Sequence, residues 1–251
     1  MAVLITILFF ITQFTLGRLL GIDYETMTDN TDEMRKGFTL RFAMTATIFT
    51  LIGVWANKAW DGGVYVQDKP PVARWMWLIP ILMIIASVAR IAVNDWGARG
   101  VEYMIALGIG VLLVGVAEET TFRGIAVRAI RGSTNSEFVV LVVTSLLFGL
   151  VHGVNILNGA HLGETLVQIG AASIGGAGFY IVVRLTGKLV WAMLLHALWD
   201  FGILGRVGDA DIVGAVTLVG QLVVWVLTAF AVIAIYRQGK RALNGDPTPS
   251  T

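Results

Sequence analysis

The chain contains no cysteine and little charge of either sign. Asp, Glu, Lys and Arg make up only 14% of its 251 residues, and there are three histidines. The lack of Cys excludes disulfides, thiolate catalysis and every Cys-ligated metal site. Soluble domains carry about 25% charged residues, so this composition excludes a soluble enzyme. A net charge of +1 provides no basic surface that would hold nucleic acid and no acidic surface for basic partners.

Apolar residues dominate instead, at 56% of the chain with a mean hydropathy of +0.77. Eight stretches are long and uncharged enough to predict transmembrane helices. They cover residues 1–17, 42–57, 75–93, 103–117, 138–156, 165–183, 189–204 and 212–236. The sequence therefore predicts an all-α fold: a polytopic membrane protein built as a bundle of about eight transmembrane helices.

The domain organisation follows from these stretches. We expect residues 1–243 to form a single transmembrane domain and residues 244–251, which include two Pro and no apolar run, to be a disordered tail. The first stretch lacks the pattern of a cleaved signal peptide and is interpreted as an anchor. The acidic connector at 20–37 is expected to be a solvated loop, and 61–71, with its Gly and Pro pairs, a turn.

An even number of spans places both termini on one side of the membrane. That side collects ten Lys and Arg near the span ends, among them Arg184, against seven on the other side, among them Arg41 and Arg90, which favours cytoplasmic termini. We therefore expect an integral, multi-pass protein, in the cytoplasmic membrane if the source is prokaryotic.

Ionisable side chains are concentrated in three of the predicted spans, although each costs about 2.5–3.5 kcal/mol at membrane depth on insertion scales. The clusters are Glu118, Glu119 and Arg123 in the fourth span, His152 in the fifth, and His196 with Asp200 in the seventh. Glu119 and Arg123 are one helical turn apart, as are His196 and Asp200, so each pair can share a helix face. If the clusters meet, they form a buried site with a carboxylate base, two imidazoles and a fixed cation, which is suited to activating water.

Other interpretations stay open for each cluster. A single intramembrane His often hydrogen-bonds a neighbouring helix, and a Glu–Arg pair can be purely structural. Taken together, the clusters also fit a proton-coupled membrane transporter, because buried Glu, His and Arg can relay protons. A catalytically silent immunity protein that keeps the site only for folding is a further alternative.

The order and spacing of the three clusters resemble the signature of a family of intramembrane proteases, the CAAX protease and bacteriocin-processing (CPBP or Abi) family. The matching motifs are Glu118-Glu119-x-x-x-Arg123, Phe148-x-x-x-His152 and His196-x-x-x-Asp200. The third motif of the family usually ends in Asn or Asp, so Asp200 is an accepted variant. The resemblance covers about residues 101–205, which would be the catalytic core.

This resemblance implies an endopeptidase that hydrolyses a peptide bond of a membrane-associated protein or peptide, as a CAAX-type or peptide-maturation protease. The implied partners are the lipid bilayer and a membrane-tethered substrate, which is prenylated in some relatives. No nucleic-acid partner is expected. Carried over by residue, Glu118 with His152 would activate water, Glu119 and Arg123 would hold the catalytic Glu, and His196 with Asp200 would stabilise the oxyanion.

The family has been described both as metal-dependent and as a metal-independent glutamic protease. Glu118, His152 and His196 are acceptable zinc ligands by atom type. No His-Glu-x-x-His helix is present, so the usual zinc-protease signature is missing. We favour water activation without a tightly held metal, with zinc as the alternative.

Overall fold

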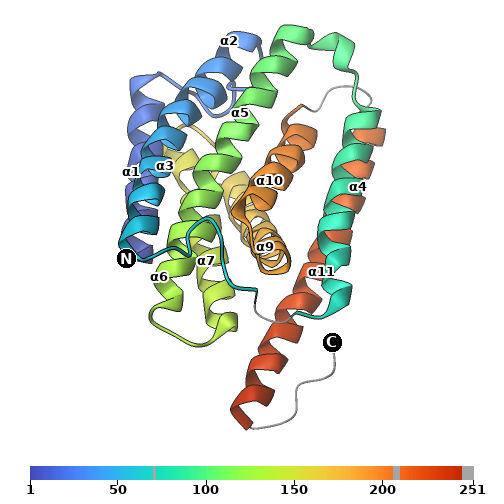
Figure 1. The fold of residues 1–251 in the computed structure, drawn as a ribbon. Coiled ribbons are helices and arrows are strands. Elements are labelled where there is room, and N and C mark those ends of the chain that lie inside the picture. Colours follow the sequence, from blue (N-terminus) through green and yellow to red (C-terminus); the bar gives the residue numbers. More distant parts are fainter. Residues whose placement is uncertain (70–71, 206–209, 245–251) are drawn as a thin grey trace.

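The computed structural model describes residues 1–69, 72–205 and 210–244, and in this part of the chain the elements are helices joined by short connectors (Figure 1). Asn244, the first residue of the expected tail at 244–251, ends a helix, whereas 245–251 and the Pro70-Pro71 part of the expected turn lie outside the described residues. An apolar segment in lipid must satisfy its backbone hydrogen bonds internally, which a helix does. The all-α prediction is confirmed.

Most of the chain forms α-helices, interrupted by short π- and 3-10-helical segments. The α-helices are α1 (Ala2–Leu19), α2 (Thr31–Met34), α3 (Arg41–Ala59), α4 (Leu78–Val93), α5 (Val101–Glu119), α6 (Val127–Arg131), α7 (Glu137–Val151), α8 (Val154–Leu157), α9 (Leu162–Thr186), α10 (Leu189–Leu204) and α11 (Ala210–Asn244). The π-helical segments are η1 (Arg35–Leu40) and η4 (Thr120–Ala126), and the 3-10 segments are η2 (Arg74–Trp77) and η3 (Trp96–Ala98).

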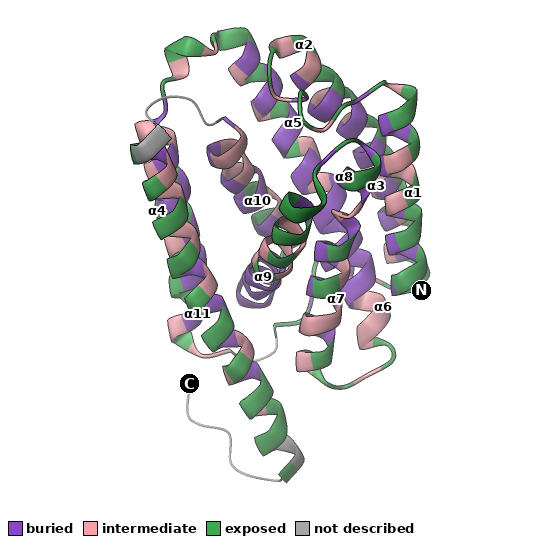
Figure 2. Ribbon diagram, turned by 180° about the vertical axis from the view of Figure 1, so that it is seen from behind, coloured by how far each residue is buried: buried purple, intermediate pink, exposed green. Residues whose placement is uncertain are grey.

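Seven helical stretches in the described residues are long and apolar enough to cross a membrane, and α10 is a shorter apolar helix beside them. Together they correspond to the eight predicted spans. Exposed residues run along these helices (Figure 2). Many of them are large and apolar, such as Leu51 of α3 and Ile85 of α4, which are 66% and 55% exposed. A soluble monomer rarely exposes contiguous apolar surface of this extent, so the outer surface is suited to lipid.

The second span begins earlier than the sequence predicted. Asn30 caps α2 by accepting hydrogen bonds from the backbone N–H groups of Asp32 and Glu33, and the helix then continues through η1 into α3. The expectation of a solvated loop over 20–37 is therefore wrong for its second half. Within the first half, Met27 is also buried.

Arg41 is a consequence of this earlier start. Arg41, Arg90 and Arg184 were all expected among the positive charges at the ends of the spans. All three are buried inside the bundle, at 4%, 0% and 3% exposure. The count of Lys and Arg that favoured cytoplasmic termini therefore includes three residues that do not lie in loops.

Two hydrophobic clusters make up the interior. One joins α1, α3 and α5 with η4, and the other joins α4, α9, α10 and α11. Helices α5 and α10 pack against each other, as do α7 and α9. Glycine makes both contacts close: a Cβ on Gly115 would lie 2.5 Å from the Met193 carbonyl oxygen, and one on Gly149 would lie 2.0 Å from Ser173 Oγ. The first contact joins the first and third polar clusters, and α9, which also packs against α10, brings α7 and the second cluster to them.

Candidate active site

The first motif lies where α5 changes into a π-helix. Glu118 and Glu119 end α5, and Arg123 lies within η4. π-helical turns are rare in proteins, and those that occur are often found at functional sites. The backbone carbonyl of Arg123 accepts a hydrogen bond from the side chain of Gln67, which is itself buried in the connector after α3. A second segment of the chain thus holds this turn in place.

Glu119 links the first motif to the third. Its Oε1 atom lies 3.0 Å from Nη1 of Arg123 and 2.8 Å from Nδ1 of His196. A carboxylate only accepts hydrogen bonds, so Nδ1 of His196 carries the proton in this contact. The Glu119–Arg123 ion pair therefore fixes the orientation of the His196 ring, with Nε2 directed away from Glu119.

The Nε2 side of His196 faces two more carboxylates. Oε2 of Glu118 lies 3.7 Å from Nε2, and Oδ2 of Asp200 lies 3.5 Å from it. Glu118 and His196 are both buried, at 6% and 4% exposure. Arg123 forms its ion pair with Glu119 and none with Glu118 in the described structure. The Glu118 carboxylate is therefore not neutralised by that guanidinium and is available to accept a proton.

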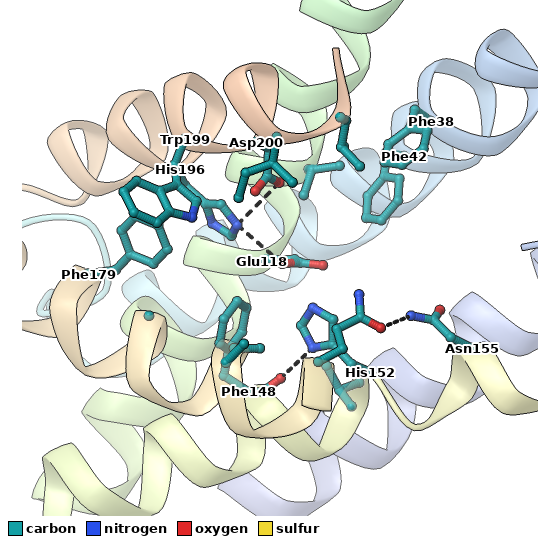
Figure 3. A pocket seen from close by; sticks show the side chains of 18 of the residues that line it. Phe38, Phe42, Glu118, Phe148, His152, Asn155, Phe179, His196, Trp199 and Asp200 are labelled. Carbon is teal, nitrogen blue, oxygen red and sulfur yellow. Dashed lines mark hydrogen bonds and ion pairs between the residues drawn. The ribbon is translucent and has the colours of Figure 1, made fainter. Parts of the chain in front are cut away.

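His152 lies across the site from His196. Its Nδ1 is 2.9 Å from the backbone carbonyl oxygen of Phe148, so Nδ1 donates and Nε2 is the acceptor nitrogen. Figure 3 places the Glu118 carboxylate between His196 and Asp200 on one side and His152 on the other. The structure therefore brings all six predicted site residues into one region.

Aromatic rings surround the charged groups. Phe179 stacks on His196 with ring centroids 4.5 Å apart, and Phe148 meets both His196 and His152 edge-on. The Arg123 guanidinium lies 4.0 Å from the Phe148 ring centroid. Such rings exclude water and strengthen the electrostatic contacts between the groups they enclose.

A cavity of about 290 Å³ opens at Glu118, His152, His196 and Asp200. Its wall also includes residues from the first, third, ninth and eleventh α-helices: Phe9, Gln13, Arg41, Phe42, Gln168, Phe179, Val224 and Trp225. A pocket with mostly apolar walls and a few convergent polar groups is the usual form of a substrate site. The cavity can therefore admit a small segment of substrate to the ionisable groups.

The zinc alternative depends on whether the donor groups converge. Within residues 1–69, 72–205 and 210–244, no three His, Cys, Asp or Glu side chains form a group that could hold a metal ion. Glu118, His152 and His196 therefore do not fit a zinc site in the present arrangement.

The sequence missed several residues of the cavity wall. Arg41 was expected at a span end, and Tyr24 in a solvated loop. Burial raises the pKa of the Tyr24 phenol, while Gln168 and the charge of Arg41 act in the opposite direction. Gln168 also accepts a hydrogen bond of 2.9 Å from Asn155, which places Asn155 in the cavity wall. The only sequence signal for Arg41 was its position next to an apolar run.

Comparison with known proteins gives one match. Residues 100–202 match the family model described as type II CAAX prenyl endopeptidase Rce1-like. The matched region contains all three motifs. No curated protein and no solved structure matches the chain.

Proposed function

We propose that Glu118 activates water to hydrolyse a peptide bond inside the bilayer, because residues 100–202 match the family model of the Rce1-like type II CAAX prenyl endopeptidases. The substrate is a membrane-associated protein or peptide, of CAAX type or a precursor in peptide maturation. One observation carries the proposal: the Glu118 carboxylate faces the cavity between the two imidazoles (Figure 3). Where the source is prokaryotic, the membrane is the cytoplasmic one.

The proposed reaction begins with a water molecule between Glu118 and Nε2 of His152. Glu118 accepts one proton of the water while the water oxygen attacks the carbonyl carbon of the scissile bond. The tetrahedral intermediate collapses, the C–N bond breaks, and the leaving nitrogen takes the proton from Glu118. The products are a new carboxyl group and a new amine, and Glu118 returns to its starting state.

His196 is proposed to stabilise the oxyanion of the tetrahedral intermediate. Its Nε2 atom lies on the side of Glu118 and, when protonated, donates a hydrogen bond. Glu119 and Arg123 hold the ring through Nδ1, and Asp200 lies one turn further along α10. In this proposal Glu119 positions His196 by a direct contact. It positions Glu118 only indirectly, as the next residue along the helix.

We further propose that the substrate carries a prenyl or similar apolar anchor. Two observations support this. The family description names a prenyl endopeptidase, and Phe38 and Phe42 form a stacked apolar wall at the cavity. Burying an apolar chain is favourable by about 25 cal/mol per Å², so the anchor adds binding energy next to the reacting bond.

The test of the activity compares Glu118→Gln with Glu102→Gln, a matched change at an exposed carboxylate on the same helix. We expect Glu118→Gln to lower the cleavage of a farnesylated reporter peptide by about 10²–10⁴-fold through loss of the general base, and Glu102→Gln to leave cleavage unchanged. Amino-terminal proteomics of membranes should show products that depend on Glu118.

If a folded Glu118→Gln protein gave the same products as the wild type, the protease proposal would be contradicted and the silent-immunity alternative would be left. Proton flux that depends on Glu118 without any peptide cleavage would favour the transporter.

A further inference from the structure

Arg41 is a buried cation in the wall of the cavity. It lies on α3, outside the region that matches the protease family, and is only 4% exposed. It is the single Lys or Arg among the described residues that line the cavity. A charged side chain at membrane depth is costly without a partner, so its position calls for one.

The Arg41 guanidinium forms no ion pair and no side-chain hydrogen bond within the described residues, and the ionisable groups whose charges act on it are Glu118 and Tyr24, both in the cavity wall. Its Nε atom is buried without a hydrogen bond, and no acidic side chain in the described residues lies within ion-pair distance of it. Its contact is with the Phe42 ring, whose centroid lies 5.0 Å from the guanidinium carbon. The nearest polar candidate on α1, Gln13, donates its amide to Thr45 instead. A guanidinium offers five donors in a planar fork that matches a carboxylate.

The cavity limits what kind of carboxylate can reach this fork. Its volume of about 290 Å³ is near the lower end of the range for small-ligand pockets. An α-helix with its side chains is about 10–12 Å across, which such a space does not admit. A short extended chain end does fit, and a chain end carries a free α-carboxylate.

We propose that Arg41 is a specificity-determining residue that binds the C-terminal carboxylate of the substrate while the water activated by Glu118 attacks a bond upstream of it. The proposal rests on the protease function proposed above. What it adds is the carboxylate-binding residue, which lies on α3 and outside the family-matched region.

The experiment uses the full-length protein in nanodiscs of phosphatidylcholine and three farnesylated peptides of one sequence. The first ends in a free carboxylate, the second in a carboxamide, and the third in a carboxamide preceded by Asp. Cleavage is measured with the wild type, and binding with the Glu118→Gln protein, each with and without Arg41→Gln and Arg41→Lys. Arg184→Gln is the matched control, because Arg184 is equally buried and does not line the cavity.

We expect the wild type to prefer the free carboxylate over the carboxamide by about 10–100-fold in kcat/KM, the range of one hydrogen-bonded charge. Arg41→Gln should remove this preference by raising KM for the free carboxylate, so that the two peptides are then cleaved with similar kcat/KM. Arg41→Lys should keep part of the preference, and Arg184→Gln all of it. The Asp peptide should behave as the carboxamide if the α-carboxylate is the ligand.

Equal cleavage of the first two peptides by the wild type would overturn the proposal, as would an equal loss on both in Arg41→Gln. Restored affinity with the Asp peptide would overturn the α-carboxylate assignment. If no peptide is cleaved, the protease proposal fails, while carboxylate-dependent binding that requires Arg41 would still support the anion subsite. Binding that does not depend on Arg41 would contradict the anion subsite.

Discussion

Glu119 and Arg123 are enclosed almost completely, with side chains 0% and 1% exposed. Removing one partner of a buried ion pair leaves an uncompensated charge, which typically costs about 3–5 kcal/mol. We expect Arg123→Met and Glu119→Gln each to lower the free energy of unfolding by that amount, and the double variant by less than the sum of the two. Denaturant unfolding in detergent micelles measures all three.

The exposed pair Arg35–Glu102 provides the comparison. It is a surface contact with side chains 48% and 70% exposed, and such pairs contribute little. Arg35→Met should leave the unfolding midpoint unchanged. Strict additivity of the two buried substitutions would contradict the coupling between Glu119 and Arg123.

The metal dependence is also tested at individual residues. The Phe148 carbonyl holds Nδ1 of His152 and Glu119 holds Nδ1 of His196, which leaves both Nε2 atoms available, but no three donors form a metal group in the described chain. We expect the purified protein to contain far less than one zinc per chain by elemental analysis, and cleavage to persist in 1,10-phenanthroline. One zinc per chain, with activity lost on chelation and restored by Zn²⁺, would contradict the metal-free reaction.

The candidate site was predictable from the sequence because charge in an apolar helix is conspicuous. Glu118, His152 and His196 each interrupt an otherwise uncharged run. Arg41 was not predictable in this way, since it precedes an apolar run and resembles an ordinary charge at a span end. Its burial depends on where the helix starts, which is fixed by the Asn30 cap.

At the scale of elements, α9 presents two glycines with opposite surroundings. A Cβ on Gly176 would lie 2.9 Å from Nη2 of Arg123 and 3.0 Å from the Phe148 ring, whereas one on Gly170 would meet nothing within 4 Å. Overpacking costs about 1–3 kcal/mol. We therefore expect Gly176→Ala to lower both thermal stability and peptide cleavage, because it displaces Arg123.

Gly170→Ala, on the same helix, should preserve both stability and cleavage, because Ala is the better helix former. Thermal unfolding and reporter cleavage of the two variants measure the difference. Equal behaviour of the two variants would show that α9 does not pack against the first motif as described.

The helices themselves were predictable from hydropathy, whereas their irregular turns were not. The π-helical segments η1 and η4 lie in stretches whose composition is that of an ordinary helix. Their wide turns depend on contacts made by other segments, such as the hydrogen bond from Gln67 to the Arg123 carbonyl. A pattern of apolar residues along one segment carries no information about such contacts.

For the whole molecule, the described helices alternate in direction, so Met1 and the end of α11 at Asn244 lie at the same end of the bundle (Figure 1). We expect tags placed before Met1 and after the last residue to be accessible from the same side of the membrane. Protease protection in oriented vesicles, with one tag at a time, measures this. Tags on opposite sides would mean that one of the apolar helices does not cross.

The reactive groups lie where the two hydrophobic clusters meet: Phe148 belongs to one cluster, and Phe179 and Trp199 to the other. Helices α7 and α10 contribute to both clusters, since Phe148 and Ala197 belong to the first and Val140 and Leu195 to the second. The alignment of the reactive groups therefore depends on the packing between the clusters, and we expect a lipid environment that loosens this packing to abolish activity while leaving the helix content intact.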